Sequence, residues 1–275
     1  MEEKFKHILR EIPQNPYFPK KNHANSSFIL YKGNSVELMK HIPRNSIDLI
    51  FADPPYRLSK GGITCHAGRM VSVNKGKWDI SKGAKEDHEF NIKWLRECQR
   101  ILSDSGTIWV SGTAHIIHSI GYAMQELNFK LLNDIVWYKI NPPPNLACRY
   151  FTHSTETIIW AAKSPKSKHI FKYKEMKAVT GKQMKNVWQD LLFWAITPPK
   201  KAEKKYGKHP TQKPVQLLER IILASSEKGD VVLDPFSGSG TTGIAAYRLK
   251  RKYIGLDLEK NYLDLTIKRY EDEIS

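Results

Sequence analysis

Four residues whose groups can act on a polar ligand stand together in the first quarter of the chain: Asp53, Pro54, Pro55 and Tyr56. They follow residues 47–52, an apolar run broken only by Asp48, which predicts a short buried strand. Two consecutive prolines end a strand because neither can donate to a ladder and each fixes φ. The turn thus offers a carboxylate, prolyl carbonyls and a ring, which could hold a planar base by its amino group. An ordinary strand-ending turn has the same composition.

A second strand-to-turn pattern begins at residue 231 and contains most of the other candidate ligand-binding residues: Asp234, Phe236, Ser237, Gly238, Gly240 and Thr241. Its glycines allow tight curvature and close approach of a ligand. Thr241 and Thr242 are predicted to cap a helix whose body is 243–249. A further strand, 252–256, then ends on Asp257.

The order of strand, glycine-rich turn, helix, strand and acid is typical of a nucleoside-binding βαβ unit, in which the acid accepts from ribose hydroxyls. The interval from Asp234 to Asp257 is close to the roughly 20 residues expected between turn and acid. The turn differs from the G-x-G-x-x-G dinucleotide fingerprint, which lacks the Asp-Pro-Phe lead-in, and no lysine follows its glycines as in a P-loop. The pattern therefore favours a nucleoside without phosphates, with a tight turn in an unrelated α/β protein as the alternative.

Together the two motifs resemble those of the DNA amino-methyltransferases that use S-adenosylmethionine. Further segments fit the same family pattern: 135–144, 151–163 with Glu156, 186–188 and 209–220. The catalytic turn comes first, a lysine-rich insert second and the cofactor turn last, an order that resembles the β class. In size and layout the chain is similar to the adenine methyltransferases of MboII-type restriction systems, and the resemblance covers about residues 28–270.

The resemblance implies a catalytic role for the first turn. Asp53 and the Pro54 carbonyl would accept the two N–H bonds of a target amino group, and Pro55 and Tyr56 complete the motif, with Tyr56 stacking on the base. Because a base inside a duplex is not open to in-line attack, its nucleotide would be flipped out.

The resemblance also implies a cofactor site for S-adenosylmethionine around the second turn. Phe236 would lie near the cofactor's adenine and Gly238 and Gly240 along its methionine portion, while core packing remains the alternative for Phe236. Asp257 would hold the ribose hydroxyls. Backbone groups around Lys213 and Pro214 would help to seat the cofactor. Two roles stay open for Asp234: binding the methionine amino group, or capping the turn.

Three functions fit these residues. The leading interpretation is a DNA adenine-N6 methyltransferase of a restriction-modification system. A cytosine-N4 methyltransferase makes the same chemical demands, but in the family Asp at the position of Asp53 favours adenine and Ser favours cytosine. A non-catalytic DNA-binding subunit is the third, although the intact motif residues speak against it.

The charge of the chain indicates a polyanionic partner. Lys and Arg number 44 against 28 Asp and Glu, a net charge of +16, which suits double-stranded DNA. Residues 163–208 contain 13 lysines and three acidic residues, interleaved with aromatic side chains such as Phe171 and Trp188. We interpret this stretch as the target-recognition insert, with a solvated surface as the alternative.

Strands alternating with helices predict a doubly wound α/β fold with a mainly parallel, Rossmann-like sheet. The expected domain organisation is an N-terminal arm (1–27), a catalytic half (28–162), the recognition insert (163–208) and a cofactor-binding half (209–275). Residues 57–87 show no period and predict a long loop. A helix over 90–102 and a strand over 107–110 are expected to follow.

The number of cysteines and the absence of long apolar runs indicate the cellular compartment in which the protein is expected. The three cysteines are widely spaced, which predicts neither a metal site nor a disulfide framework and suits the cytoplasm. Neither a signal peptide nor a membrane-spanning run is expected. A homodimer and a cognate restriction endonuclease acting separately stay open as partners.

Overall fold

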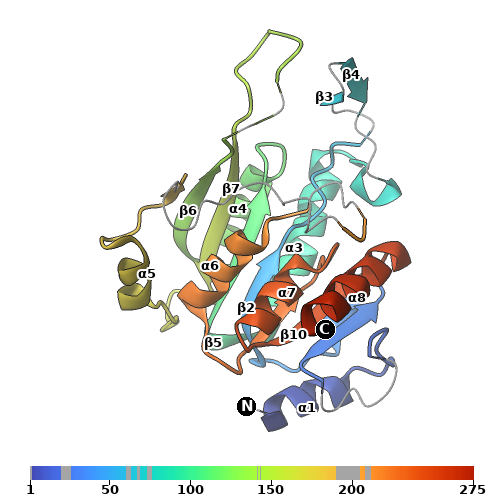
Figure 1. Cartoon of the computed structure of the whole chain (residues 1–275), viewed down its shortest axis with the longest axis vertical. Coiled ribbons are helices and arrows are strands. Elements are labelled where there is room, and N and C mark those ends of the chain that lie inside the picture. Colours follow the sequence, from blue (N-terminus) through green and yellow to red (C-terminus); the bar gives the residue numbers. More distant parts are fainter. Residues whose placement is uncertain are drawn as a thin grey trace.

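The computed structural model describes residues 2–19, 26–59, 63–66, 69–72, 76–140, 142, 144–189, 205–207 and 212–275. Within them the chain folds around one eight-stranded sheet (Figure 1). Its strands are β1 (Phe28–Lys32), β2 (Ile47–Ala52), β5 (Leu102–Gly112), β6 (Lys130–Tyr138), β7 (Thr155–Ala162), β8 (Val187–Trp188), β9 (Val231–Asp234) and β10 (Lys252–Asp257). A separate hairpin joins β3 (Ile63–His66) to β4 (Arg69–Ser72).

The sheet has the order β1-β10-β9-β2-β5-β7-β6-β8. Strands β1, β10, β9, β2 and β5 are mutually parallel, whereas β7 runs antiparallel to both of its neighbours. This arrangement confirms the predicted doubly wound α/β fold.

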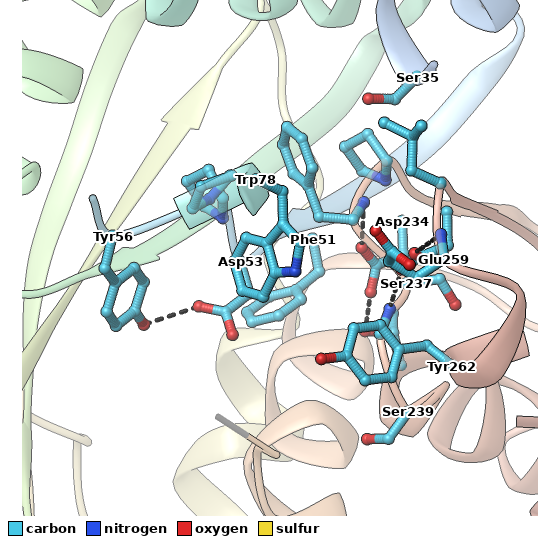
Figure 2. A pocket seen from close by; sticks show the side chains of 18 of the residues that line it. Ser35, Phe51, Asp53, Tyr56, Trp78, Asp234, Ser237, Ser239, Glu259 and Tyr262 are labelled. Carbon is cyan, nitrogen blue, oxygen red and sulfur yellow. Dashed lines mark hydrogen bonds between the residues drawn. The ribbon is translucent and has the colours of Figure 1, made fainter. Parts of the chain in front are cut away.

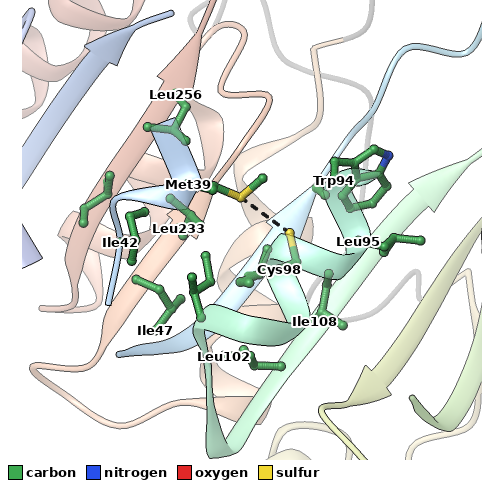
Figure 3. Close-up of a cluster of buried hydrophobic side chains, with 14 of the residues drawn as sticks. Met39, Ile42, Ile47, Trp94, Leu95, Cys98, Leu102, Ile108, Leu233 and Leu256 are labelled. Carbon is green, nitrogen blue, oxygen red and sulfur yellow. Dashed lines mark hydrogen bonds between the residues drawn. The ribbon is translucent and has the colours of Figure 1, made fainter. Parts of the chain in front are cut away.

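Helices cover both faces of the sheet. They are α1 (Glu2–Glu11), α2 (Ser35–Lys40), α3 (Ala84–Ile101), α4 (Ile117–Glu126), α5 (Tyr173–Thr180), α6 (Val215–Ser225), α7 (Thr241–Arg248) and α8 (Lys260–Ile274). One core cluster lies between the sheet and α1–α4, and a second lies between the sheet and α6–α8 (Figure 3 shows part of the first). In β9 the side chains alternate as a two-faced strand requires, since Val231 and Leu233 enter the first cluster and Val232 the second.

The adjacency of β2 and β9 explains how the two sequence motifs meet. Leu49 lies opposite Val232 and Ile50 opposite Leu233 in a parallel register. Parallel strands end at the same edge of a sheet, and ligands gather there in open α/β folds. Asp53 and Asp234, far apart in the chain, therefore emerge side by side.

Three local predictions were wrong. The predicted loop 57–87 contains the β3–β4 hairpin, the 3₁₀ helix η2 (Lys77–Asp79) and the start of α3. Buried Asp79 organises this segment because its carboxylate accepts backbone N–H bonds from Arg57, Leu58 and Ser59. The chain also enters β5 at Leu102 and not at residue 107, since the pairing with β2 shifts register between those points.

The third correction concerns the cofactor turn. Helix α7 begins at Thr241, with Gly240 as its N-cap and no side-chain capping bond, so Thr241 and Thr242 belong to the helix and do not cap it. Thr242 instead donates from Oγ1 to Asp234 Oδ2 at 2.6 Å.

Two segments that were predicted to lie outside the main domain, the N-terminal arm and the recognition insert, both contribute to its fold. Helix α1 buries Phe5, Ile8 and Leu9 in the first core cluster, so the N-terminal arm is packed on the domain. Within the predicted insert, β8 extends the main sheet beside β6. Residues 190–204 and 208 of the insert lie outside the described residues, and its role in recognition stays a prediction. No helix among the described residues is long and apolar enough to span a bilayer.

Candidate active site

A cavity of about 670 Å³ lies at the carboxyl ends of β2, β9 and β10. Most of the predicted site residues line it: Asp53, Pro54, Pro55, Tyr56, Lys213, Asp234, Phe236, Ser237, Gly238, Thr241 and Asp257. Figure 2 shows the two groups facing one another, with Asp53 and Tyr56 on one side and Asp234 and Ser237 on the other. Gly240 and Pro214 do not line the cavity, and the predicted motif residues 209–211 lie outside the described part of the chain.

The Asp53 carboxylate is held by three side-chain donors. The Ser111 hydroxyl donates to Oδ1 at 2.6 Å, and the Tyr56 hydroxyl donates to the same oxygen at 2.7 Å. The Lys213 ammonium donates to Oδ2 at 2.7 Å. Charge-assisted hydrogen bonds of this kind fix a carboxylate firmly in one orientation.

Lys213 connects Asp53 to a second buried carboxylate. Its Nζ lies 2.9 Å from the Tyr56 hydroxyl and 3.4 Å from Glu156 Oε2. Lys139 binds the other oxygen of Glu156. Lys213 and Glu156 are only 6% and 7% exposed, so this network is shielded from water.

Burial and charge oppose one another in this network. Burial disfavours the charged forms, but the two carboxylates raise the pKa of Lys213 well above its usual value. Burial likewise opposes ionisation of Glu156, yet the ammonium groups of Lys213 and Lys139 lower its pKa to about 2. Burial and the neighbouring Asp53 charge raise the pKa of Tyr56. At neutral pH the network therefore contains a charged Lys213, an ionised Glu156 and a neutral Tyr56 phenol.

The opposite wall of the cavity is built on two other acids. Asp257 accepts the N–H of Gly238 on Oδ2 at 2.7 Å and that of Glu259 on Oδ1 at 2.8 Å. Asp234 accepts the N–H of Phe236 at 3.0 Å, in addition to its bond from Thr242. Burial raises the pKa of Asp257 to about 6 and that of Asp234 to about 7. Asp234 thus has the contacts of a turn-capping residue, and its binding to a methionine amino group stays a prediction.

Phe236 packs against the core and also borders the cavity. Its ring packs against the first core cluster, with the Trp94 ring 5.4 Å away in an edge-on arrangement, and it also lines the cavity. The core contact fixes the ring that a ligand would meet.

Several lining residues escaped the motif search: Asn34, Ser35, Trp78, Phe90, Glu259 and Tyr262. Asn34 and Ser35 come just after β1. Ser111, which binds Asp53, likewise lies near the end of β5, and both strands end at the same edge of the sheet. Polar residues directly after parallel strands are thus the signal that could have found them. Trp78 carries no such signal because it sits in the segment predicted as a loop.

The geometry of the glycine-rich turn predicts how a substitution at Gly240 changes the free energy of unfolding. Gly240 has φ +72°, and a Cβ there would collide with Thr266 Cγ2 and lie 2.7 Å from Thr266 Oγ1. Gly181 has φ +71° with nothing within 4 Å of the same added atom. Gly181→Ala should cost only the left-handed strain of about 1–2 kcal/mol. Gly240→Ala should cost clearly more in the free energy of unfolding, measured by urea denaturation. Equal losses for the two variants would show that the Thr266 contact can relax freely.

Comparison with known proteins agrees with this geometry. The model of the DNA methylase family N6_N4_Mtase matches residues 47–268. The Type II methyltransferase M2.DpnII of Streptococcus pneumoniae is 51% identical over 260 residues, which is 94% of this chain and 93% of the relative. M2.MboI of Moraxella bovis is 48% identical over 258 residues, 94% of this chain and 91% of the relative.

Solved structures agree on the fold. The M1.HpyAVI–SAM complex has a TM-score of 0.59 at 25% identity and covers 87% of this chain and 97% of its own. The cytosine-N4-specific PvuII DNA methyltransferase has a TM-score of 0.67 at 21% identity, with 88% and 86% covered, and shows the shared fold alone. The chain therefore belongs to the DNA methylase family and is an S-adenosylmethionine-dependent DNA methyltransferase.

Proposed function

We propose that this enzyme methylates the N6 amino group of adenine in duplex DNA, at a specific site, as the modification half of a restriction-modification system. One observation supports the proposal above the others: the Asp53 carboxylate and the turn expected to bind the cofactor line the same cavity. A methyl donor and an acceptor base held there would face one another directly.

The residues present fit the cofactor. A volume of about 670 Å³ is within the range of pockets that enclose a nucleoside-sized ligand. The Asp257 side chain stands at the end of β10, where an acid accepts from ribose hydroxyls in nucleoside-binding folds. S-adenosylmethionine, when bound, supplies a methyl group on a cationic sulfonium. The carboxylates of Asp234 and Asp257 on this wall are negatively charged groups that would stabilise such a cation.

The chemistry assigned to Asp53 follows from the acceptor. The lone pair of the adenine amino nitrogen is delocalised into the ring, so the nitrogen is a weak nucleophile. Hydrogen bonds from its two N–H groups to Asp53 and the Pro54 carbonyl favour a tetrahedral nitrogen with a localised lone pair. They also stabilise the positive charge that develops during transfer more than they stabilise the ground state, which is where a rate gain arises. Asp53 then takes up the proton that the nitrogen releases.

Tyr56 is assigned to hold the base from one face. Its ring lines the cavity, and its hydroxyl is fixed by Asp53 and Lys213. A ring held at its polar end by two bonds is a rigid platform for stacking.

The connection between β6 and β7 fits a DNA partner. It starts from the same edge of the sheet as Asp53 and projects beyond it (Figure 1). Phe151 is 96% exposed and Tyr150 59% exposed, Arg149 beside them is exposed as well, and residues 139–155 contain no acid. Exposed aromatic and basic side chains together suit contact with phosphates and unstacked bases.

Cytosine-N4 methylation is the second candidate, because the amino group of cytosine makes the same demands on Asp53 and Pro54. The fold is shared with a cytosine-N4-specific enzyme and does not discriminate. Adenine is preferred because the resemblance to the family associates Asp at this position with adenine. The proposal also includes two partners: a cognate restriction endonuclease that acts separately, and a second copy of this chain in a homodimer.

Product analysis tests the proposed target. The purified enzyme is incubated with mixed-sequence duplex DNA and S-adenosylmethionine that carries a labelled methyl group, and the DNA is digested to nucleosides. Label in N6-methyladenine supports the proposal. Label in N4-methylcytosine would overturn the choice of base, and no label above that given by Asp53→Ala would overturn the activity.

Cofactor affinity should depend on pH in a defined direction. Burial raises the pKa of Asp234 to about 7 and that of Asp257 to about 6. Both acids are ionised above pH 7, and they take up protons as the pH falls through these values, which removes the charge that favours a cation. We expect binding of S-adenosylmethionine to be about tenfold weaker at pH 5 than at pH 8. Calorimetric titration at both pH values measures this, and affinity that rises at pH 5 would contradict it.

A further inference from the structure

We propose that Lys213 occupies, in the base-free enzyme, the place of the target amino group at Asp53, and that Glu156 is the positioning residue that receives the Lys213 ammonium when the base enters. The inference rests on the proposed function, since it deepens the account of how the base is held.

The hydrogen bonds of Asp53 single out one oxygen for the target. Oδ1 already accepts from Ser111 and Tyr56, at 2.6 and 2.7 Å. Oδ2 accepts from Lys213 Nζ at 2.7 Å. Both Lys213 Nζ and an exocyclic amino group are nitrogen donors, and the ammonium stands where the amino group needs to donate. Oδ2 could accept a second bond, as Oδ1 does, but a base that donates to Oδ2 would then lie next to the cationic ammonium.

Electrostatics requires the ammonium to withdraw. The target nitrogen becomes cationic during methyl transfer, and the same carboxylate must stabilise that charge. A second cation bound to this oxygen would oppose the first, and in a buried site the repulsion is strong because little water screens it. An enzyme that kept Lys213 on Oδ2 would weaken its own transition-state stabilisation.

Among the residues that the structure describes, Glu156 is a second carboxylate within short range of the ammonium. Glu156 Oε2 already lies 3.4 Å from Lys213 Nζ, slightly beyond the length of a strong charge-assisted bond. Lys139 holds the other Glu156 oxygen, and the pairing of Trp137 with Glu156 fixes the backbone between β6 and β7. A small rotation of the flexible lysine side chain would move its charge from one carboxylate to the other, and no proton would be gained or lost.

The alternative is a fixed ion-pair network that only stabilises the fold. In a fixed network, removing one partner leaves a buried charge uncompensated and lowers the free energy of unfolding, and removing both partners of a pair recovers much of that loss. The rate of transfer in a variant that is still folded should then stay close to that of the wild type. In the exchange that we propose, removing the Lys213 charge relieves the defect caused by removing the Glu156 charge, because nothing then has to move away from Asp53. The two accounts therefore differ in the rate of transfer: only the exchange predicts that Glu156→Gln slows transfer in a folded enzyme and that the second substitution restores part of the rate.

The experiment compares Glu156→Gln, the double variant Glu156→Gln/Lys213→Gln and the conservative variant Glu156→Asp. Glu89→Gln, which removes an exposed carboxylate of α3, is the matched control. Single-turnover methylation gives the rate of transfer, calorimetry gives the dissociation constant for S-adenosylmethionine, and thermal unfolding verifies that each variant is folded. The wild-type rate on adenine is measured first, so a failure of the proposed function itself is seen separately.

We expect Glu156→Gln to slow transfer by about 10²-fold, as a misplaced group at a reacting centre does, with the cofactor dissociation constant unchanged. Glu156→Asp should recover part of the rate, and the double variant should be faster than Glu156→Gln alone. A double variant as slow as the single variant, or slower, would overturn the proposal. So would a wild-type rate in Glu156→Gln.

Discussion

Replacing Asp53 by Ala is expected to slow methyl transfer by about 10³-fold, the size of effect seen when a group that stabilises developing charge is removed. The substitution deletes the acceptor of the target N–H bond and the group that takes up its proton. Lys213 keeps Glu156 as a partner, at 3.4 Å, so the network does not lose its only anion. The affinity for S-adenosylmethionine should stay nearly constant because the cofactor is assigned to the opposite wall.

Single-turnover rates and calorimetric dissociation constants measure the two quantities separately. Asp104→Ala is the matched control, since the Asp104 side chain is 88% exposed and far along the chain from either turn. Loss of cofactor binding in a folded Asp53→Ala variant would show that the division of the cavity between base and cofactor is wrong.

Asp257→Ala should have the reverse effect. The carboxylate holds the N–H groups of Gly238 and Glu259, and it is the acid expected to accept from the ribose hydroxyls. Hydrogen bonds to a charged group contribute about 1.5–3 kcal/mol each, so we expect the dissociation constant for S-adenosylmethionine to rise by about 10²-fold. At saturating cofactor the rate of transfer should recover.

Glu271→Ala removes an exposed acid from α8 and serves as the control for this variant. Asp257→Asn keeps one acceptor oxygen and should fall between the wild type and Asp257→Ala. A variant with normal cofactor affinity but slow transfer would contradict the assignment of Asp257 to the ribose.

The fold was predictable where short-range physics decides it. Residues 47–52 were expected to form a strand because they are apolar and end at two prolines, and β2 has these bounds. The glycine-rich turn after β9 was likewise visible in the residues themselves. The path of residues 57–59 was missed, because the buried carboxylate of Asp79 fixes it from a distance of about 20 positions.

The chemistry of the site was predictable only in part. The resemblance assigned Lys213 to the cofactor through its backbone, but its side chain contacts Asp53, 160 positions away. That contact depends on the order of strands in the sheet and on the packing of the segment before α6, and no local pattern encodes either. Glu156 was noted as part of a family segment, yet its pairing with Lys139 depends on the pairing of β6 with β7, and its contact with Lys213 depends on the packing of the segment before α6.

The position of the target base tests the central claim most directly. The measurement is a crystal structure of this enzyme with duplex DNA and a non-transferring analogue of S-adenosylmethionine. The account predicts a flipped adenine whose amino nitrogen lies within hydrogen-bonding distance of Asp53 Oδ2 and the Pro54 carbonyl, with the analogue between the glycine-rich turn and Asp257. A base that remains stacked in the duplex, or an analogue bound outside this cavity, would contradict it.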